Sequence, residues 1–190
     1  ASQDLKGRYF GTVGAVARHE HDAVDRITGQ WNAVRPDVDM SPVGIVGRVS
    51  RLSRLVDRRL AANFARFGIE NWMYDVLATL RRAGEPYELT AGDLVRQSMV
   101  TTGAITNRID RLEARGLVER ARTDDRRKVI VRLTARGRDL VDDVVGEHLA
   151  TEREILAALT PRQQHELAHL LRLTLLHLGD RADPTDDGGE

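Results

Sequence analysis

Apolar residues recur at steps of three and four along most of the chain, the spacing that gathers them on one face of an α-helix. This spacing predicts a helix from about residue 17 to 34 and a longer amphipathic helix from 41 to 67, with many arginines opposite its apolar stripe. Pro36 separates the two helices, because the residue before a proline avoids helical geometry. Ser41 is the predicted N-cap of the second helix, and Pro42 takes its first helical position.

Three shorter helices follow, separated by turns and glycines. We expect one from 71 to 82, one after the N-cap Thr90, and one that opens at Thr101 or Thr102 and ends at Gly116. The last two are short and lie close together in the sequence. Such a pair predicts a helix-turn-helix.

Beyond this pair the apolar period changes from that of a helix to the alternation of a β-strand. Strands are expected at 117–120 and 129–133, and the polar run 123–128 between them predicts a hairpin with a charged tip. Two more helices are expected after the N-caps Thr134 and Thr160, the second with a capping box and a proline at its first position.

These elements predict a mainly α fold with a small β-hairpin wing, in which a winged helix-turn-helix lies between long terminal helices. The expected division is two N-terminal helices over 1–67, the winged helix-turn-helix over 68–136, C-terminal helices over 137–180 and a disordered acidic tail over 181–190.

Composition narrows the class of protein. The chain has 190 residues, of which 41% are hydrophobic, enough to build a core. It has no cysteine, which excludes disulfides, thiolate metal sites and cysteine nucleophiles. No apolar run approaches the roughly 20 residues that cross a bilayer, and no signal-peptide pattern opens the chain. We therefore expect a cytoplasmic protein with no membrane partner.

The net charge of zero conceals a strongly uneven distribution. Residues 96–138 carry 12 Lys/Arg and 5 Asp/Glu, a net charge of +7, whereas residues 139–190 carry 4 and 12, a net charge of −8. Phosphate contacts release counterions locally, so a basic block is significant whatever the distant charges are. An isolated basic run is ordinarily a solvated surface, but this one coincides with the predicted helix pair and hairpin. The coincidence favours double-stranded DNA as a partner.

The second helix of the pair has the chemistry of a recognition helix, which enters the major groove and contacts base edges. Ile105, Ile109 and Leu112 are expected to face the core. The hairpin tip is expected to reach a narrow minor groove, where negative potential is enhanced. The candidate DNA-binding residues are Thr101, Thr102, Thr106, Asn107 and Arg111 on the helix, with Arg126 and Arg127 on the hairpin.

Two stretches, 103–118 and 125–137, together resemble the core of MarR-family transcriptional regulators. The second joins an Asp-Arg-Arg hairpin to a Leu-Thr-x-x-Gly pattern, and the resemblance covers most of residues 43–178. It implies a homodimer whose terminal helices interlock and whose two winged lobes bind the halves of palindromic DNA. The apolar stripes of the terminal regions fit this independently, because a domain this small cannot bury them without a partner.

The N-terminal segments 30–37 and 41–48 are similar to the urate-responsive branch of that family. That branch implies a repressor released by a small anionic ligand, urate or a related purine. Its ligand residues are a tryptophan on the added helix, an aspartate before the DNA-binding lobe, and two arginines, on the recognition helix and the first wing strand. By position these are Trp31, Asp75, Arg108 and Arg120.

Simple physics supports this set, although each member has an ordinary alternative. Two arginines supply fixed donors for a planar anion, and an indole supplies a stacking face. Repulsion between the anion and Asp75 would move the lobe. Equally, Trp31 fits a core position, Asp75 a cap or ion pair within its helices, Arg108 a phosphate contact and Arg120 an exposed strand position.

Other classes of protein are less well supported. The sequence has no phosphate loop, HExxH pattern or nucleophile elbow, so we expect neither an enzyme nor a cofactor. His165 and His169 have the spacing of a metal pair but lie on a predicted dimerisation helix, and His19 and His21 have too little pattern. An architectural DNA-binding protein without a ligand, and a regulator of another anion such as a tricarboxylate, remain the alternatives.

Overall fold

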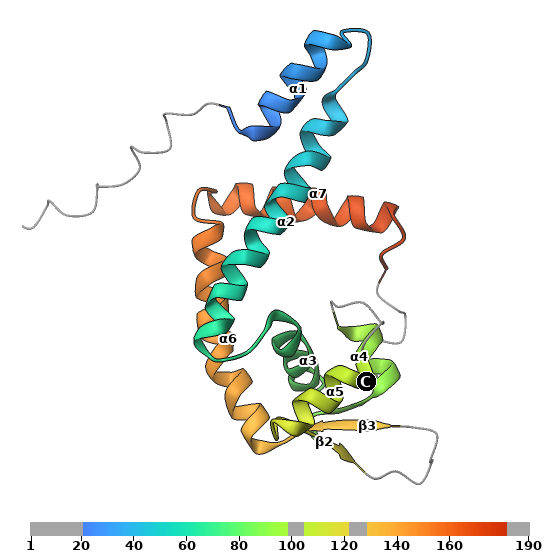
Figure 1. The fold of residues 1–190 in the computed structure, drawn as a ribbon, viewed down its shortest axis with the longest axis vertical. Coiled ribbons are helices and arrows are strands. Elements are labelled where there is room, and N and C mark those ends of the chain that lie inside the picture. Colours follow the sequence, from blue (N-terminus) through green and yellow to red (C-terminus); the bar gives the residue numbers. More distant parts are fainter. Residues whose placement is uncertain (1–20, 99–104, 122–128, 182–190) are drawn as a thin grey trace, which may run out of the picture. The chain divides into compact units, whose positions relative to one another are not determined.

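The computed structural model describes residues 21–98, 105–121 and 129–181 (Figure 1). Its elements are α1 (Ala23–Val34), α2 (Ser41–Arg66), α3 (Asn71–Arg82), β1 (Glu88–Thr90), α4 (Ala91–Gln97), α5 (Ile105–Ala114), β2 (Val118–Ala121), β3 (Ile130–Leu133), α6 (Ala135–Ile155) and α7 (Pro161–His177). The predicted fold class is confirmed, since helices predominate and the three strands form one small antiparallel sheet. The chain divides into two compact units, residues 1–56 and 57–190.

In the first unit, α1 begins later than its apolar period suggests. Asp22 is its N-cap, with Oδ1 accepting from the amides of Val24 at 2.7 Å and Asp25 at 3.0 Å. The Asp25 carboxylate accepts in return from the Asp22 amide at 2.8 Å, which completes a capping box. The predicted start near 17 is therefore wrong, because these polar groups fix the first turn at Ala23. The end at Val34 agrees with the sequence.

The junction before α2 differs from the prediction by one residue. Ser41 lies inside the helix, and Asp39 accepts from its amide at 2.9 Å. Arg48 of α2 binds both acidic residues of the α1 cap, at 2.8 Å from Asp22 and 2.5 Å from Asp25. Beside it, Val24 is buried against the backbone at Gly47. This pairing makes α1 and the first half of α2 a helical hairpin.

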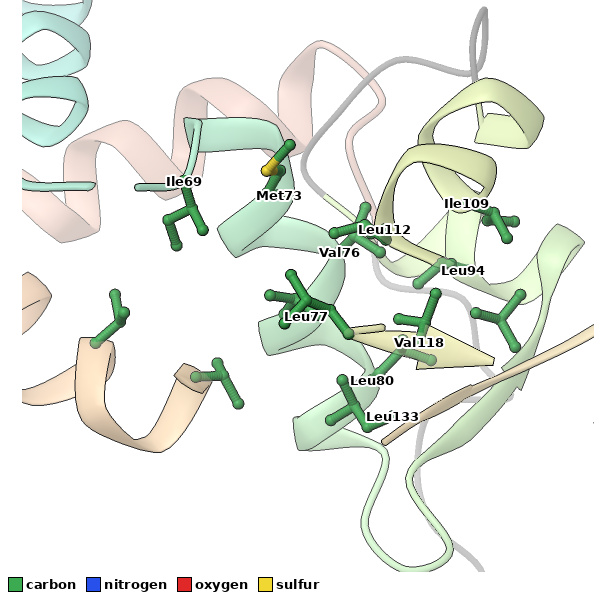
Figure 2. Close-up of a cluster of buried hydrophobic side chains, with 14 of the residues drawn as sticks. Ile69, Met73, Val76, Leu77, Leu80, Leu94, Ile109, Leu112, Val118 and Leu133 are labelled. Atoms are coloured by element: carbon green, nitrogen blue, oxygen red, sulfur yellow. The ribbon is translucent and has the colours of Figure 1, made fainter. Parts of the chain in front are cut away.

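The second unit has a closed hydrophobic core centred on α3 (Figure 2). Met73, Val76, Leu77 and Leu80 of α3 are buried. The core also contains these buried residues from the other elements: Phe64, Ile69, Leu94, Ile109, Leu112, Leu117, Val118, Val131, Leu133, Val141 and Val144. As the sequence predicts, the buried face of α5 consists of Ile109 and Leu112, with Ile105 packed at the edge. This packing fixes which face of α5 remains exposed.

The wing hairpin is confirmed, and a third strand completes the sheet in the order β1-β3-β2. Both pairings are antiparallel, and Arg132 lies opposite Glu88 on one side and Glu119 on the other. Arg132 donates to Glu88 at 2.5 Å. The sequence did not reveal β1, because three residues are too few to establish an alternation.

The three predicted threonine caps are confirmed. Thr90, Thr134 and Thr160 each accept from an amide three residues on. Thr134 also donates to the carbonyl of Gly116 at 2.8 Å. Gly137 completes this anchor, since a Cβ there would lie 2.0 Å from the Leu117 carbonyl oxygen. The Leu-Thr-x-x-Gly pattern therefore fixes the start of α6 against the turn between α5 and β2.

Helix α7 contrasts with the core, because none of its residues is buried. Its large apolar residues, and those around its end, are exposed: Leu170, Leu171, Leu173, Leu175, Leu176 and Leu178. A similar exposed stripe on α2 consists of Ile45, Val46, Val49, Leu52 and Leu55. Among the helices of the described residues, none is both long and apolar enough to span a membrane.

Candidate DNA-binding and ligand sites

Helix α5 carries three of the candidate DNA-binding residues on its exposed surface. Thr106, Asn107 and Arg111 are exposed, whereas Ile109 and Leu112 are buried. The other candidates, Thr101, Thr102, Arg126 and Arg127, lie outside the described residues. What the structure describes of the recognition helix therefore offers a hydroxyl, an amide and a guanidinium on one face.

Arg111 does not project freely but belongs to a cluster with Glu70 and Trp72 at the start of α3. Its Nη2 donates to Glu70 Oε1 at 2.5 Å, and its guanidinium lies 4.7 Å from the centroid of the Trp72 ring. The Trp72 indole Nε1 donates to the second oxygen of Glu70 at 2.9 Å. We call these three residues the Glu70–Trp72–Arg111 cluster. Sequence reasoning did not find it, because Glu70 and Arg111 are 41 residues apart.

The carboxylate of this cluster is held in its ionised form. The hydrogen bond from Trp72 and then that from Arg111 lower the pKa of Glu70 below its ordinary value of 4.5. Glu70 is therefore negatively charged at neutral pH, directly beside the exposed face of α5.

Arg108 lies at the edge of the same region. Its guanidinium carbon is 5.7 Å from the centroid of the Trp72 ring, and its side chain is partly buried. Its Nη1 is buried and has no hydrogen-bond partner among the described residues. Asp75, also partly buried, lies one turn after Trp72 on α3. Two of the four predicted ligand residues thus lie near Trp72, namely Asp75 on the same helix and Arg108 on α5.

Arg120 is tied to the opposite flank of α5. It donates to Asp110 at 2.5 Å and to Glu113, and its own amide donates to Glu113 at 3.3 Å. The hydrogen bond with Asp110 is the main reason that the pKa of Arg120 is raised. Asp110 follows Arg108 by two residues, about 200° around a helix. The two arginines of the predicted ligand set therefore lie on different sides of the recognition helix.

The remaining predicted ligand residue, Trp31, belongs to the first compact unit. It lies on α1 with 49% of its surface exposed. The other three residues of the set belong to the second unit.

The histidines weighed as metal ligands gain no further support from the structure. His165 and His169 are exposed on α7, and His21 is exposed before α1. Within the described ranges, no group of three or more histidine, aspartate or glutamate side chains could hold a metal ion.

Comparison with known proteins gives a consistent family. A model described as MarR family matches residues 67–128. The HTH-type transcriptional regulator PecS of Dickeya dadantii is 38% identical over 156 residues, which cover 82% of this chain and 94% of that protein.

Two solved structures agree in fold. A mutant of MarR from E. coli complexed with operator DNA has a TM-score of 0.61 and 26% identity, covering 76% of this chain and 97% of that one. BpsR of Bordetella bronchiseptica, described with regulation of its DNA binding by 6-hydroxynicotinic acid, has a TM-score of 0.61 and 25% identity, covering 68% and 93%.

These relatives are transcriptional regulators rather than enzymes, and their winged fold is the one built here around α5 and the β2-β3 hairpin. The chain belongs to the MarR family of DNA-binding, winged helix-turn-helix transcriptional regulators.

Proposed function

We propose that this protein is a cytoplasmic repressor that binds palindromic operator DNA as a homodimer and is released by a small planar anion such as urate. The observation that carries the ligand response is the buried Nη1 of Arg108, which has no hydrogen-bond partner among the described residues. Buried donors are almost always satisfied, so an unsatisfied Nη1 on a guanidinium of α5 favours an acceptor supplied from outside.

DNA binding is assigned to α5 and the wing. The exposed Thr106, Asn107 and Arg111 share one face of a helix, and an α-helix fits the major groove. The surrounding segment 96–138 carries a net charge of +7. The E. coli relative in complex with operator DNA supports the same use of the fold.

Homodimerisation is assigned to the apolar faces of α2 and α7. Leu170, Leu173 and Leu178 are each at least half exposed, and a stripe of this kind is normally covered by a partner. Residues 41–66 carry six arginines and one aspartate, whereas 139–190 has a net charge of −8. Because the two segments are complementary in charge as well as apolar, a second copy of the chain fits them.

Release by an anion follows from the position of Arg108 on α5. An anion held by this side chain favours one orientation of the recognition helix, and it shifts DNA affinity only by its different affinity for the two orientations. Such a coupling is typically about 1–3 kcal/mol, or roughly 5- to 150-fold in affinity. Arg120 joins the ligand only by leaving Asp110 and Glu113, which would loosen the other flank of α5.

The test is a DNA titration at one stated salt concentration, with and without urate. The duplex is selected by this protein from a random-sequence pool. We expect urate to weaken binding by the wild type and to leave Arg108→Gln unaffected. Arg153→Gln is the control, because Arg153 is exposed on α6 and has no ion pair among the described residues.

The other outcomes separate the alternatives. Tight selective binding that urate leaves unchanged refutes urate and directs the search to xanthine or tricarboxylates. Failure to select any sequence, with binding to all duplexes, supports the architectural alternative. A rise in melting temperature with urate alone is a second readout, since a ligand that binds the native state stabilises it.

A further inference from the structure

We propose that Glu70 is an intramolecular competitor of DNA for Arg111. Its carboxylate holds a guanidinium that otherwise binds a backbone phosphate, and so it lowers affinity for duplexes of every sequence. The inference rests on the DNA contact by α5 proposed above, and it adds a residue of α3 that sets the strength of that contact.

The first support is the match between the two acceptors. Arginine binds carboxylate and phosphate oxygens through the same planar fork of donors. In the Glu70–Trp72–Arg111 cluster, Nη2 of Arg111 already donates to Glu70 at 2.5 Å, and one face of the guanidinium lies over the indole. The side chains of Arg111 and Glu70 are 50% and 54% exposed, so a phosphate reaches the same donor from solvent.

The second support is that Glu70 has no other evident role. It is the N-cap of α3, but its side chain makes no hydrogen bond to the amides of that helix. Both of its oxygens are used instead by Arg111 and the Trp72 indole. Trp72 thus orients the carboxylate toward α5 and away from the helix end, where an N-cap side chain is ordinarily bound.

The third support is the small contribution of such a pair to folding. Exposed ion pairs add little stability, because solvent screens them and two long side chains must be ordered. The core beneath the cluster is apolar and closed, and Ile109 and Leu112 already fix α5 there. The effect of Glu70 therefore falls on what Arg111 binds, and its negative charge additionally opposes an approaching phosphate.

The experiment uses the full chain in four forms: wild type, Glu70→Gln, Arg111→Ala and the double variant. Glutamine keeps an oxygen that accepts from Trp72 but loses the charge. Affinity is measured by fluorescence anisotropy over a series of salt concentrations, on a duplex selected by this protein and on an unrelated duplex of equal length. Glu154→Gln is the matched control, since Glu154 is exposed on α6 and has no ion pair among the described residues.

We expect Glu70→Gln to bind both duplexes about two- to fivefold more tightly, the range set by an exposed ion pair. The slope of log affinity against log salt should stay close to that of the wild type, because Arg111 contacts a phosphate in both proteins and only the competition from Glu70 is lost. In the Arg111→Ala background the same substitution should have a much smaller effect, because the pair is already broken and only the repulsion between Glu70 and phosphate is removed. Glu154→Gln should match the wild type.

Three results overturn the inference: unchanged affinity in Glu70→Gln, an equal gain in the Arg111→Ala background, or a gain confined to the selected duplex. A wild type that binds no duplex at all overturns the proposed DNA-binding function as well. Trp72 emission gives an independent readout in a Trp31→Phe protein. It should change when DNA draws Arg111 from the ring, and a DNA-induced change that persists in Arg111→Ala contradicts the proposal.

Discussion

The winged lobe and helix α7 are both rich in leucine, but they differ in whether these leucines are buried. In the lobe, Leu77, Leu80 and Leu112 are completely buried between α3, α5 and the sheet. On α7, Leu170 and Leu173 are 53% and 51% exposed, and no residue is buried. Apolar periodicity predicts both helices equally well. The lobe therefore buries its leucines within the chain, whereas the apolar face of α7 is left exposed.

We assign a different role to each of these two regions. The closed core of the lobe fixes the orientation of α5 and so determines which of its residues are exposed. The open face of α7, together with the apolar stripe of α2, is the surface that we assign to a second copy. Substitutions in the two regions should therefore differ in how their effects depend on protein concentration.

The largest expected effect comes from a leucine in each region. Leu77→Ala should lower the free energy of unfolding by about 2–5 kcal/mol, because it leaves a cavity in the lobe. Leu173→Ala should lower the free energy of unfolding by less. This loss of stability should disappear as the protein is diluted and the dimer dissociates. Urea unfolding at several protein concentrations measures both. If the loss of stability in Leu173→Ala does not depend on protein concentration, α7 does not carry a dimer face.

Two glycines of α6 test how closely this helix must pack against the lobe. Gly137→Ala should destabilise by about 1–3 kcal/mol or more, since its Cβ would lie 2.0 Å from a backbone oxygen. Gly146→Ala is the control on the same helix, where a Cβ meets nothing within 4 Å. It should stabilise by about 0.5–1 kcal/mol, because alanine is the better helix former. Equal effects at the two positions would show that the anchor at Gly137 is unimportant.

Function should be separable from stability on the exposed face of α5. Arg111→Ala should weaken binding to all duplexes and reduce the salt slope by about 1 for each chain bound, as expected for a lost phosphate contact. The melting temperature should hardly change, because the side chain is half exposed. A drop of several degrees would instead make Arg111 a structural residue of the lobe.

The smallest expected effect concerns the α1–α2 hairpin and pH. The amide of Asp25 is the main cause that lowers the pKa of Asp22, and Arg48 is the main cause for Asp25. Because both values lie below the ordinary 3.8, the stabilisation is present above that pH and is lost as pH falls through the lowered values. The emission of Trp31, measured in a Trp72→Phe protein, reports whether the α1–α2 hairpin is folded. At neutral pH the hairpin of Arg48→Gln should be less stable than that of the wild type. In acid the two hairpins should be equally stable.

The sequence predicts those features that depend on neighbouring residues. The caps at Thr90, Thr134 and Thr160, and the buried face of α5, follow from local chemistry and period. The predicted start of α1 is wrong, because the Asp22 capping box outweighs the apolar period.

Features that join distant segments were not predictable in this way. Strand β1 exists through its pairing with β3, 42 or so residues along the chain, which no three-residue pattern reveals. The Glu70–Trp72–Arg111 cluster and the attachment of Arg120 to Asp110 likewise arise only when α5 packs. The ligand set is therefore still a prediction, with Arg108 and Arg120 on different flanks of one helix.

Sedimentation of the protein, alone and with a fluorescent duplex that it has selected, measures whether it is a dimer and how many chains bind one duplex. We expect a dimer in free solution that binds DNA as one unit, giving two chains per duplex. Leu173→Glu should yield a folded monomer that binds DNA weakly, because a charge cannot be covered at an apolar face. A wild-type chain that remains monomeric at high concentration and binds one per duplex would contradict the account.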